Sequence, residues 1–319
     1  MDSYKLVRLR SILVTLFIGC VAAQVCMYLN SWVLDLWDVP LHGGVPDWFK
    51  RYVAPVTEET VKALYVVYLV RANKVGFGVD AAIRGFAIGT GFSWIENVQY
   101  LMALGDASVY LWIVRGFGTA VLHGSTMAIF AILAKGLADR RGERGVLVFV
   151  PGFLVAVALH SMFNHFPLPP IALTALLLLV MPLLVIVVFE RSEQATRRWL
   201  GTGLDADMEL HELIRSGEIR NDHVGVYLQS LRKRFPGAVV ADMLCLLQIQ
   251  LELSMQAKAV LMARKAGLEL PVAEDARANL QELDFLQKAV GPTGRLAIAP
   301  FIKTSSRDLW QIYMLSGGT

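Results

Sequence analysis

The chain has 319 residues, of which 55% are hydrophobic and only 18% are charged, and its mean hydropathy is +0.51. This composition excludes an ordinary soluble domain of that length and indicates a protein that lies in a lipid bilayer. The formal net charge of +3 is too small to indicate a nucleic-acid partner, because the basic residues lie in short clusters beside apolar runs.

Apolar segments long enough to cross the bilayer follow one another through the first part of the chain. About 20 helical residues are needed to cross roughly 30 Å of hydrocarbon. The segments that meet this length cover approximately residues 11–30, 48–70, 79–104, 108–134, 146–166 and 169–189. The first is longer than the apolar region of a usual signal peptide and no A-x-A site follows it, so we expect an uncleaved helix.

Charges in the connecting loops predict the orientation of these segments. Lys and Arg are concentrated in the N-terminus, in the second and fourth loops, and in the tail that begins at Arg191. The first and third loops instead carry acidic residues such as Asp35 and Asp106. By the positive-inside rule, this alternation places both termini in the cytoplasm. We therefore expect residues 1–190 to form a six-helix transmembrane domain.

The character of the sequence changes after Glu190. A juxtamembrane linker over residues 191–202 precedes residues 203–319, which are charged and place apolar residues such as Leu247 and Leu251 at helical spacing. This part is predicted to be a cytoplasmic helical domain with a small core of its own, which could bind a cytoplasmic partner. The expected fold is all-α: a polytopic bundle of about six transmembrane helices plus this C-terminal domain.

Several ionisable side chains lie inside the predicted spans. They are Glu58, Glu59 and Lys62 in the second span, Glu96 in the third, His123 in the fourth and His160 in the fifth. An ionisable group in a spanning helix is costly unless it faces a protein interior or a wet cavity, so such groups indicate a functional site. At about 1.5 Å per residue, the carboxylates and imidazoles all fall in the middle or outer half of the membrane.

The spacing in the second span predicts how its charges pair. Lys62 is three residues from Glu59 and four from Glu58, so its ammonium can reach either carboxylate on a helix. Two adjacent carboxylates cannot both ionise at low cost in a low-dielectric site. We expect one of them to stay protonated and the other to pair with Lys62, which provides an acid and a base together.

These residues form short motifs in a fixed order. Glu58 to Lys62 has the form E-E-x-x-K, Phe92 to Asn97 reads F-x-x-x-E-N, His123 follows on another apolar segment, and His160 to Asn164 has the form H-x-x-x-N. In this order and membrane placement, the motifs resemble those of the PrsW family of intramembrane proteases, which are related to the CAAX prenyl endopeptidases. The resemblance covers roughly residues 50–165.

The resemblance implies that the protein hydrolyses a peptide bond of a membrane-anchored protein, with regulated cleavage of an anti-sigma factor as the best-known family role. It would then be an integral protein of a bacterial cytoplasmic membrane. Glu58 or Glu59 would be the general base that activates a water molecule. Glu96, His123 and His160 would position this water, bind a metal or stabilise the oxyanion. Independently of the resemblance, the spacing and position of the neighbouring polar residues predict that they support the site: Lys62, Asn97, Asn164 and Arg115.

The sequence leaves a divalent metal such as Zn²⁺ open. Glu96, His123 and His160 form a set of two histidines and one carboxylate, which matches catalytic zinc sites in ligand type. However, the three residues come from different segments and no H-E-x-x-H motif is present. A glutamate mechanism without metal, as the CAAX relatives suggest, fits the same residues.

Two other classes of function also fit. Buried Glu, Lys and His residues form proton relays in transporters and proton-coupled channels, although no inverted repeat is visible here. A non-catalytic membrane scaffold would use Glu58, Glu59 and Lys62 as a structural ion network and would bind a lipid or a partner.

Overall fold

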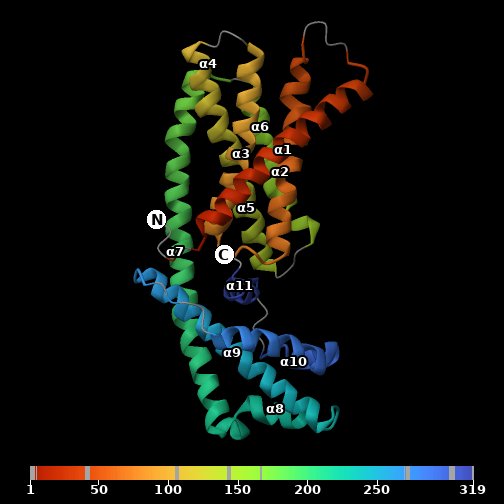
Figure 1. The fold of residues 1–319 in the computed structure, drawn as a ribbon, viewed down its shortest axis with the longest axis vertical. Coiled ribbons are helices and arrows are strands. Elements are labelled where there is room, and N and C mark those ends of the chain that lie inside the picture. Colours follow the sequence, from red (N-terminus) through yellow and green to blue (C-terminus); the bar gives the residue numbers. More distant parts are fainter. Residues whose placement is uncertain are drawn as a thin grey trace. The chain divides into compact units, whose positions relative to one another are not determined.

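The computed structural model describes residues 4, 6–39, 44–104, 108–141, 145–165, 167–268, 270, 274–301 and 306–317. These residues form helices and no strand, which confirms the all-α prediction (Figure 1). The α-helices are α1 (Leu9–Leu36), α2 (Ala54–Arg71), α3 (Gly78–Leu104), α4 (Val109–Ile113), α5 (Ala120–Arg141), α6 (Val150–Asn164), α7 (Pro170–Ser216), α8 (His223–Leu231), α9 (Gly237–Lys265), α10 (Glu274–Ile298) and α11 (Ser306–Leu315).

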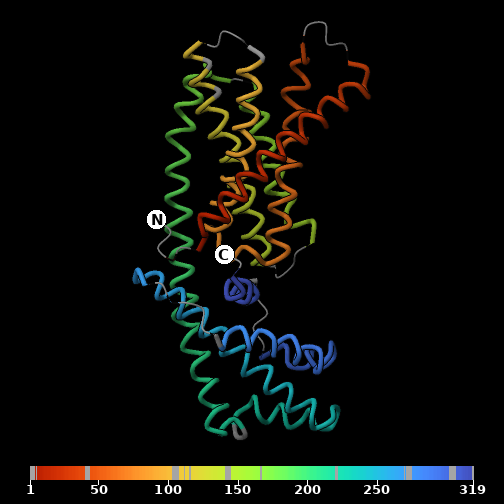
Figure 2. Tube along the Cα trace, viewed as in Figure 1, coloured from red at the N-terminus to blue at the C-terminus, as the bar shows by residue number. Residues whose placement is uncertain are grey.

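The chain divides into two compact units. One unit covers Val7–Ser192, and the other combines Glu193–Thr319 with the first six residues. The helix α7 runs without a break through the boundary, so the predicted linker over residues 191–202 is helical (Figure 2). Asp106, which entered the topology prediction, lies outside the described residues.

Among the described helices, five are long and apolar enough to cross a membrane: Leu9–Leu36, Gly116–Arg140, Val146–Asn164, Pro170–Ser216 and Gly237–Lys265. The first four coincide with predicted spans. The helices α2 and α3 do not meet this criterion, because they carry the charged and polar residues of the motifs. Their crossing of the membrane therefore remains a prediction.

The fifth long apolar helix, α9, was predicted to belong to the C-terminal domain. It packs against α10 and α11, and its predicted core residues Leu247 and Leu251 are buried. A helix that is apolar on most of its surface is either a membrane span or the centre of a protein core. The packing favours a core helix, and the cytoplasmic location of this unit remains a prediction.

The helix α3 lies at the centre of the first unit, between α1 and α5. Glycine allows its close approach to α5, since a Cβ atom at Gly89 would collide with the carbonyl of His123, and one at Gly85 would collide with the carbonyl of Met127. Small residues at such contacts let two helix backbones meet without intervening side chains. The contact at Gly89 sets the depth at which His123 enters the bundle.

Wide π-helical turns precede two of the helices that carry motif residues. One covers Phe49–Val53 directly before α2, and the other covers Val114–Thr119 directly before α5. Single π turns are rare and are frequently found at functional sites. The predicted spans at residues 48–70 and 108–134 are therefore not continuous α-helices.

Candidate active site

The buried charges of α2 form the base of the site. The ammonium of Lys62 donates a hydrogen bond to Oε1 of Glu59 at 2.6 Å, and both side chains are fully buried. The hydroxyl of Thr126, on α5, lies 3.4 Å from the same oxygen and 3.2 Å from the backbone carbonyl of His123, and its one proton can be donated to either. Lys62 thus pairs with Glu59 rather than with Glu58, a choice that helix spacing alone had left open.

His123 links this ion pair to α3. Its Nδ1 atom lies 2.8 Å from Nζ of Lys62, and its Nε2 atom lies 2.9 Å from Oε2 of Glu96. An ammonium can only donate, so Nδ1 must accept and the proton must be on Nε2, from which it is donated to Glu96. The contacts at both nitrogens therefore determine the tautomer of this imidazole.

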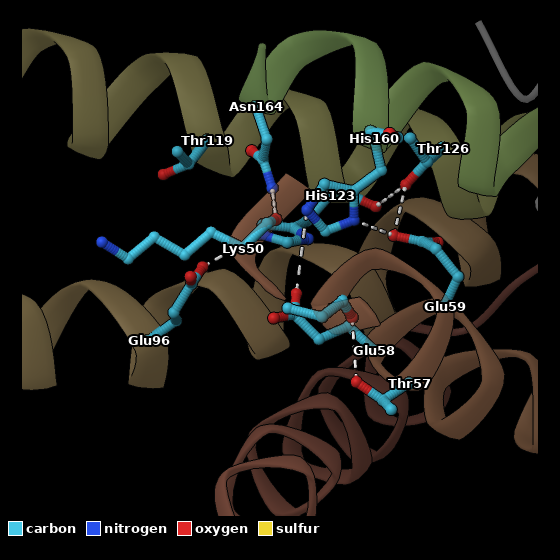
Figure 3. Close-up of polar contacts among 12 residues, drawn as sticks. Lys50, Thr57, Glu58, Glu59, Glu96, Thr119, His123, Thr126, His160 and Asn164 are labelled. Carbon is cyan, nitrogen blue, oxygen red and sulfur yellow. Dashed lines mark hydrogen bonds and ion pairs between the residues drawn. The ribbon is translucent and has the colours of Figure 1, made fainter. Parts of the chain in front are cut away.

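His160 approaches the same carboxylate from α6. Its Nδ1 atom lies 2.7 Å from Oε1 of Glu59 and donates to that oxygen, which leaves the lone pair of Nε2 available. This Nε2 atom lies 3.8 Å from Oε2 of Glu58. The Glu58 oxygen is buried and has no hydrogen-bond partner among the described residues. An accepting nitrogen and an unsatisfied carboxylate oxygen thus face each other (Figure 3).

A small cavity adjoins these groups. It has a volume of about 30 Å³, and its polar lining comes from Asn30, Glu58, Glu96 and Gln99. A cavity needs roughly 10–15 Å³ and two or more polar partners to hold a water molecule. This cavity meets both conditions, so a water molecule can lie between the carboxylates of α2 and α3.

The remaining predicted site residues are Asn97, Asn164 and Arg115. Asn97 donates to Ser93 at 3.2 Å and accepts from Thr119 at 3.0 Å. Asn164 donates through Nδ2 to the backbone carbonyl of Lys50 at 2.9 Å. The side chain of Arg115 lies outside the described residues.

Sequence reasoning missed Thr126 as a member of the site. It lies three residues after His123 on the same helix, so the two side chains point in similar directions, and this spacing could have identified it. It also missed that Phe92 supports Lys62, whose ammonium lies 4.6 Å from the centre of the Phe92 ring. An aromatic face stabilises a buried cation in this position.

The model of a known protein family, described as the PrsW family intramembrane metalloprotease, matches residues 8–189. The match covers more than half of the chain and every helix that contributes to the site. The chain belongs to the PrsW family. No curated protein and no solved structure matches it.

Membership of the PrsW family makes the protein an integral membrane protein and an intramembrane protease, and therefore a hydrolase. The family was predicted from the motifs, and the match confirms that prediction. The matched residues end before Glu193, so the family assignment concerns the first unit.

The donor atoms of this PrsW protein fit a divalent metal. One ligand atom each from Glu58, His123 and His160 lie within 4.8 Å of one another. The unsatisfied Glu58 oxygen and the free lone pair of His160 are ready ligands, whereas both nitrogens of His123 already have partners. Glu59, which orients His160 through Nδ1, occupies the place that a second carboxylate takes behind a metal-bound histidine.

This set differs in one member from the predicted one. The sequence analysis proposed Glu96 as the carboxylate ligand with His123 and His160. The structure brings Glu58 to the two histidines, and Glu96 contacts His123 by a hydrogen bond instead. Two imidazoles and one carboxylate remain the ligand types of catalytic zinc sites.

Proposed function

We propose that this PrsW protein is an endopeptidase that hydrolyses a peptide bond of a membrane-anchored protein, with Glu58 in contact with the attacking water. The observation that carries the proposal is that Glu58, which has a buried oxygen without a hydrogen-bond partner in the described part of the chain, lines a cavity of about 30 Å³, whereas Glu59 does not line it. A general base must lie within hydrogen-bond reach of the proton that it accepts, either directly or through one water.

Glu59 has a different role in this proposal. Its Oε1 atom accepts from Lys62 and His160, and, unlike Glu58, it does not line the cavity, although its Oε2 atom is also buried without a hydrogen-bond partner among the described residues. We assign it to orienting His160 while Lys62 neutralises its charge. Of the two adjacent glutamates in the E-E-x-x-K motif, Glu58 thus contacts the water and Glu59 supports the site.

A metal would be held by Glu58, His123 and His160, and its chemistry there is to polarise a water molecule and the scissile carbonyl. With Glu58 used as a ligand, Glu96 is the other carboxylate on the cavity wall that can accept the proton from water. Without metal, Glu58 accepts that proton itself. Glu58 is required in both cases, whereas Glu96 is the base in only one.

The substrate class follows from the position of the site. In a spanning helix the backbone carbonyls are already hydrogen-bonded, so a segment must unwind locally before its peptide bond can be attacked. We propose a membrane-anchored, anti-sigma-factor-like protein as the substrate, in a bacterial cytoplasmic membrane with both termini of the enzyme in the cytoplasm. The C-terminal unit offers a surface for a cytoplasmic partner.

The test compares new N-termini in the membrane fraction of cells that carry the wild-type protein or Glu58→Gln. We expect a small set of membrane-anchored proteins to be cut in the wild type and to remain intact in the variant. Identical sets of N-termini would contradict the assignment of Glu58. Solute uptake by proteoliposomes without any cleavage would instead favour a proton-coupled transporter.

A further inference from the structure

A proline at the start of α2 removes helical donors from two backbone carbonyls of the preceding turn. In the preceding π turn, the amide of Ala54 bonds to the carbonyl of Phe49, a spacing of five residues. The next amide in line would come from residue 55, which is a proline and has no N–H. The carbonyl of Lys50 therefore has no amide donor five residues later, and the carbonyl of Arg51 has no amide donor four residues later.

The C-terminal end of α6 supplies the missing donors. The hydroxyl of Ser161 donates to the carbonyl of Arg51 at 2.6 Å, and Nδ2 of Asn164 donates to the carbonyl of Lys50 at 2.9 Å. Ser161 and Asn164 are three residues apart, so they share one face of α6. Backbone carbonyls that are left unpaired in an apolar environment are costly, which makes this match between the two segments specific.

A further contact follows at the next position of the turn. Nδ1 of His165 lies 2.7 Å from the carbonyl of Ser161 and donates to it, so Nε2 accepts from the hydroxyl of Tyr52 at 3.1 Å. The Tyr52 and His165 rings pack edge to face with centres 5.1 Å apart. Three successive residues before α2 are thus held by the end of α6.

We propose that Ser161 and Asn164 are positioning residues that fix the start of α2 against α6, and thereby hold Glu58 and Glu59 against His160. Glu58 lies in the first turns of α2, directly after the turn that these contacts hold, and its Oε2 atom lies 3.8 Å from Nε2 of His160. His160 directly precedes Ser161. The contacts at the turn therefore set the separation of the reacting groups, and this inference rests on the proposed function.

A positioning role for Asn164 differs from a direct catalytic role as an oxyanion donor. An oxyanion donor would contact the substrate and would act independently of the backbone of α2. A positioning residue acts only because Pro55 leaves a carbonyl without a donor. The two roles therefore predict different responses to Pro55→Ala, which restores an N–H at that position.

The experiment is a double-mutant cycle with Asn164→Leu and Pro55→Ala, measured as kcat and KM for a membrane-anchored protein that the comparison of N-termini shows to be cut. We expect Asn164→Leu alone to lower kcat by about tenfold or more with little change in KM, because small misplacements of reacting groups are costly. In the Pro55→Ala background the same change should cost less than about threefold, since the two sites are coupled. Equal losses in both backgrounds would overturn the proposal.

Ser161→Ala keeps the inference testable if Pro55→Ala does not fold. It removes the donor to Arg51 without touching Asn164, and kcat should fall by about tenfold for the same reason. The matched control is Thr60→Val, because the Thr60 hydroxyl bonds to the carbonyl of Val56 within α2 itself. Full activity of Ser161→Ala, equal to that of Thr60→Val, would overturn the positioning role.

A measurement without catalysis separates this inference from the proposed function. The same cycle can be run on thermal unfolding in detergent with Glu58→Gln present throughout. Coupling between Pro55→Ala and Asn164→Leu should persist there, whereas purely additive shifts in Tm would count against the contact. If Glu58→Gln still cleaves substrate, the base assignment fails while the result of this cycle stands.

Discussion

Lys62 and His123 are joined by a contact of 2.8 Å between Nζ and Nδ1 that connects α2 to α5 in the centre of the bundle. Both side chains are buried, and the ammonium also bonds to Glu59. One cation therefore neutralises the carboxylate of the E-E-x-x-K motif and directs the imidazole proton toward Glu96. The lysine of this motif is thus fully buried between a carboxylate and an imidazole.

Replacing this cation should destabilise the protein. Lys62→Met leaves the Glu59 carboxylate buried without its charged partner, and breaking a buried pair in this way costs about 3–5 kcal/mol of unfolding free energy. The double variant Lys62→Met with Glu59→Gln should recover part of the loss, because no unpaired charge remains. Denaturant unfolding in detergent measures both, and equal stability of the single and double variants would contradict the pairing.

The two glutamates of α2 should respond differently to amide substitution. Glu58→Gln should lower the cleavage rate by about 10²–10⁴-fold, the usual contribution of a general base, with Tm unchanged. Glu59→Gln should lower both rate and Tm, because Oε1 of Glu59 accepts hydrogen bonds from Lys62 and His160. Cleavage assays and thermal unfolding of each variant provide the test. Normal turnover of Glu58→Gln would remove it from the reaction.

Metal content should depend on the three clustered donors. We expect the purified wild type to contain about one divalent metal per chain by elemental analysis, and Glu58→Ala and His160→Ala to lose it. His223→Ala is the matched control, since its imidazole is exposed in the C-terminal unit. Equal metal content in wild type and His160→Ala would exclude the site.

The role of Glu96 depends on the same result. If chelation abolishes cleavage and metal addition restores it, Glu96→Gln should lower the rate by about 10²-fold or more as the loss of a general base. If chelation has no effect, Glu58 is the base, and Glu96→Gln should reduce the rate less than Glu58→Gln does. Equal rates for chelated wild type and chelated Glu58→Gln would contradict the metal-free form.

The close approach of α3 and α5 should not tolerate a side chain at Gly89. A Cβ atom there would overlap the carbonyl of His123, so Gly89→Ala should displace His123 and lower both Tm and activity. Gly136→Ala, on α5, is the control, because the added methyl group meets no atom within 4 Å. That variant should be as stable as wild type or up to about 1 kcal/mol more stable. Parallel behaviour of the two variants would argue against the contact.

The helical segments of the first unit could be predicted because each must bury its own backbone polar groups in hydrocarbon, which long apolar runs report directly. The turns before α2 and α5 could not. Similar sequences can form a π turn, with hydrogen bonds across five residues, or an α turn, with hydrogen bonds across four. Which turn forms depends on tertiary contacts such as those of Ser161 and Asn164.

The sequence indicated which residues belong to the candidate site, but not which of them contact one another. Charges in an apolar run mark Glu58, Glu59, Lys62, Glu96, His123 and His160, because each must face a polar interior. Helix spacing allowed Lys62 to reach either glutamate, and the sequence analysis chose Glu96 as the carboxylate that joins the histidines, whereas the structure brings Glu58 to them. The choice depends on how far α2, α3, α5 and α6 are shifted along one another, which local sequence does not encode.

The amino-acid sequence alone therefore determined the helical class, the family and the set of residues that can carry acid–base chemistry, since hydropathy and motif order are properties of single segments. Only the tertiary structure decided that Glu59 accepts from Lys62 and His160, while Glu58 faces His160 and lines a water-sized cavity. The physical reason is distance: hydrogen bonds of about 3 Å between four helices depend on their mutual depth and rotation, which packing sets.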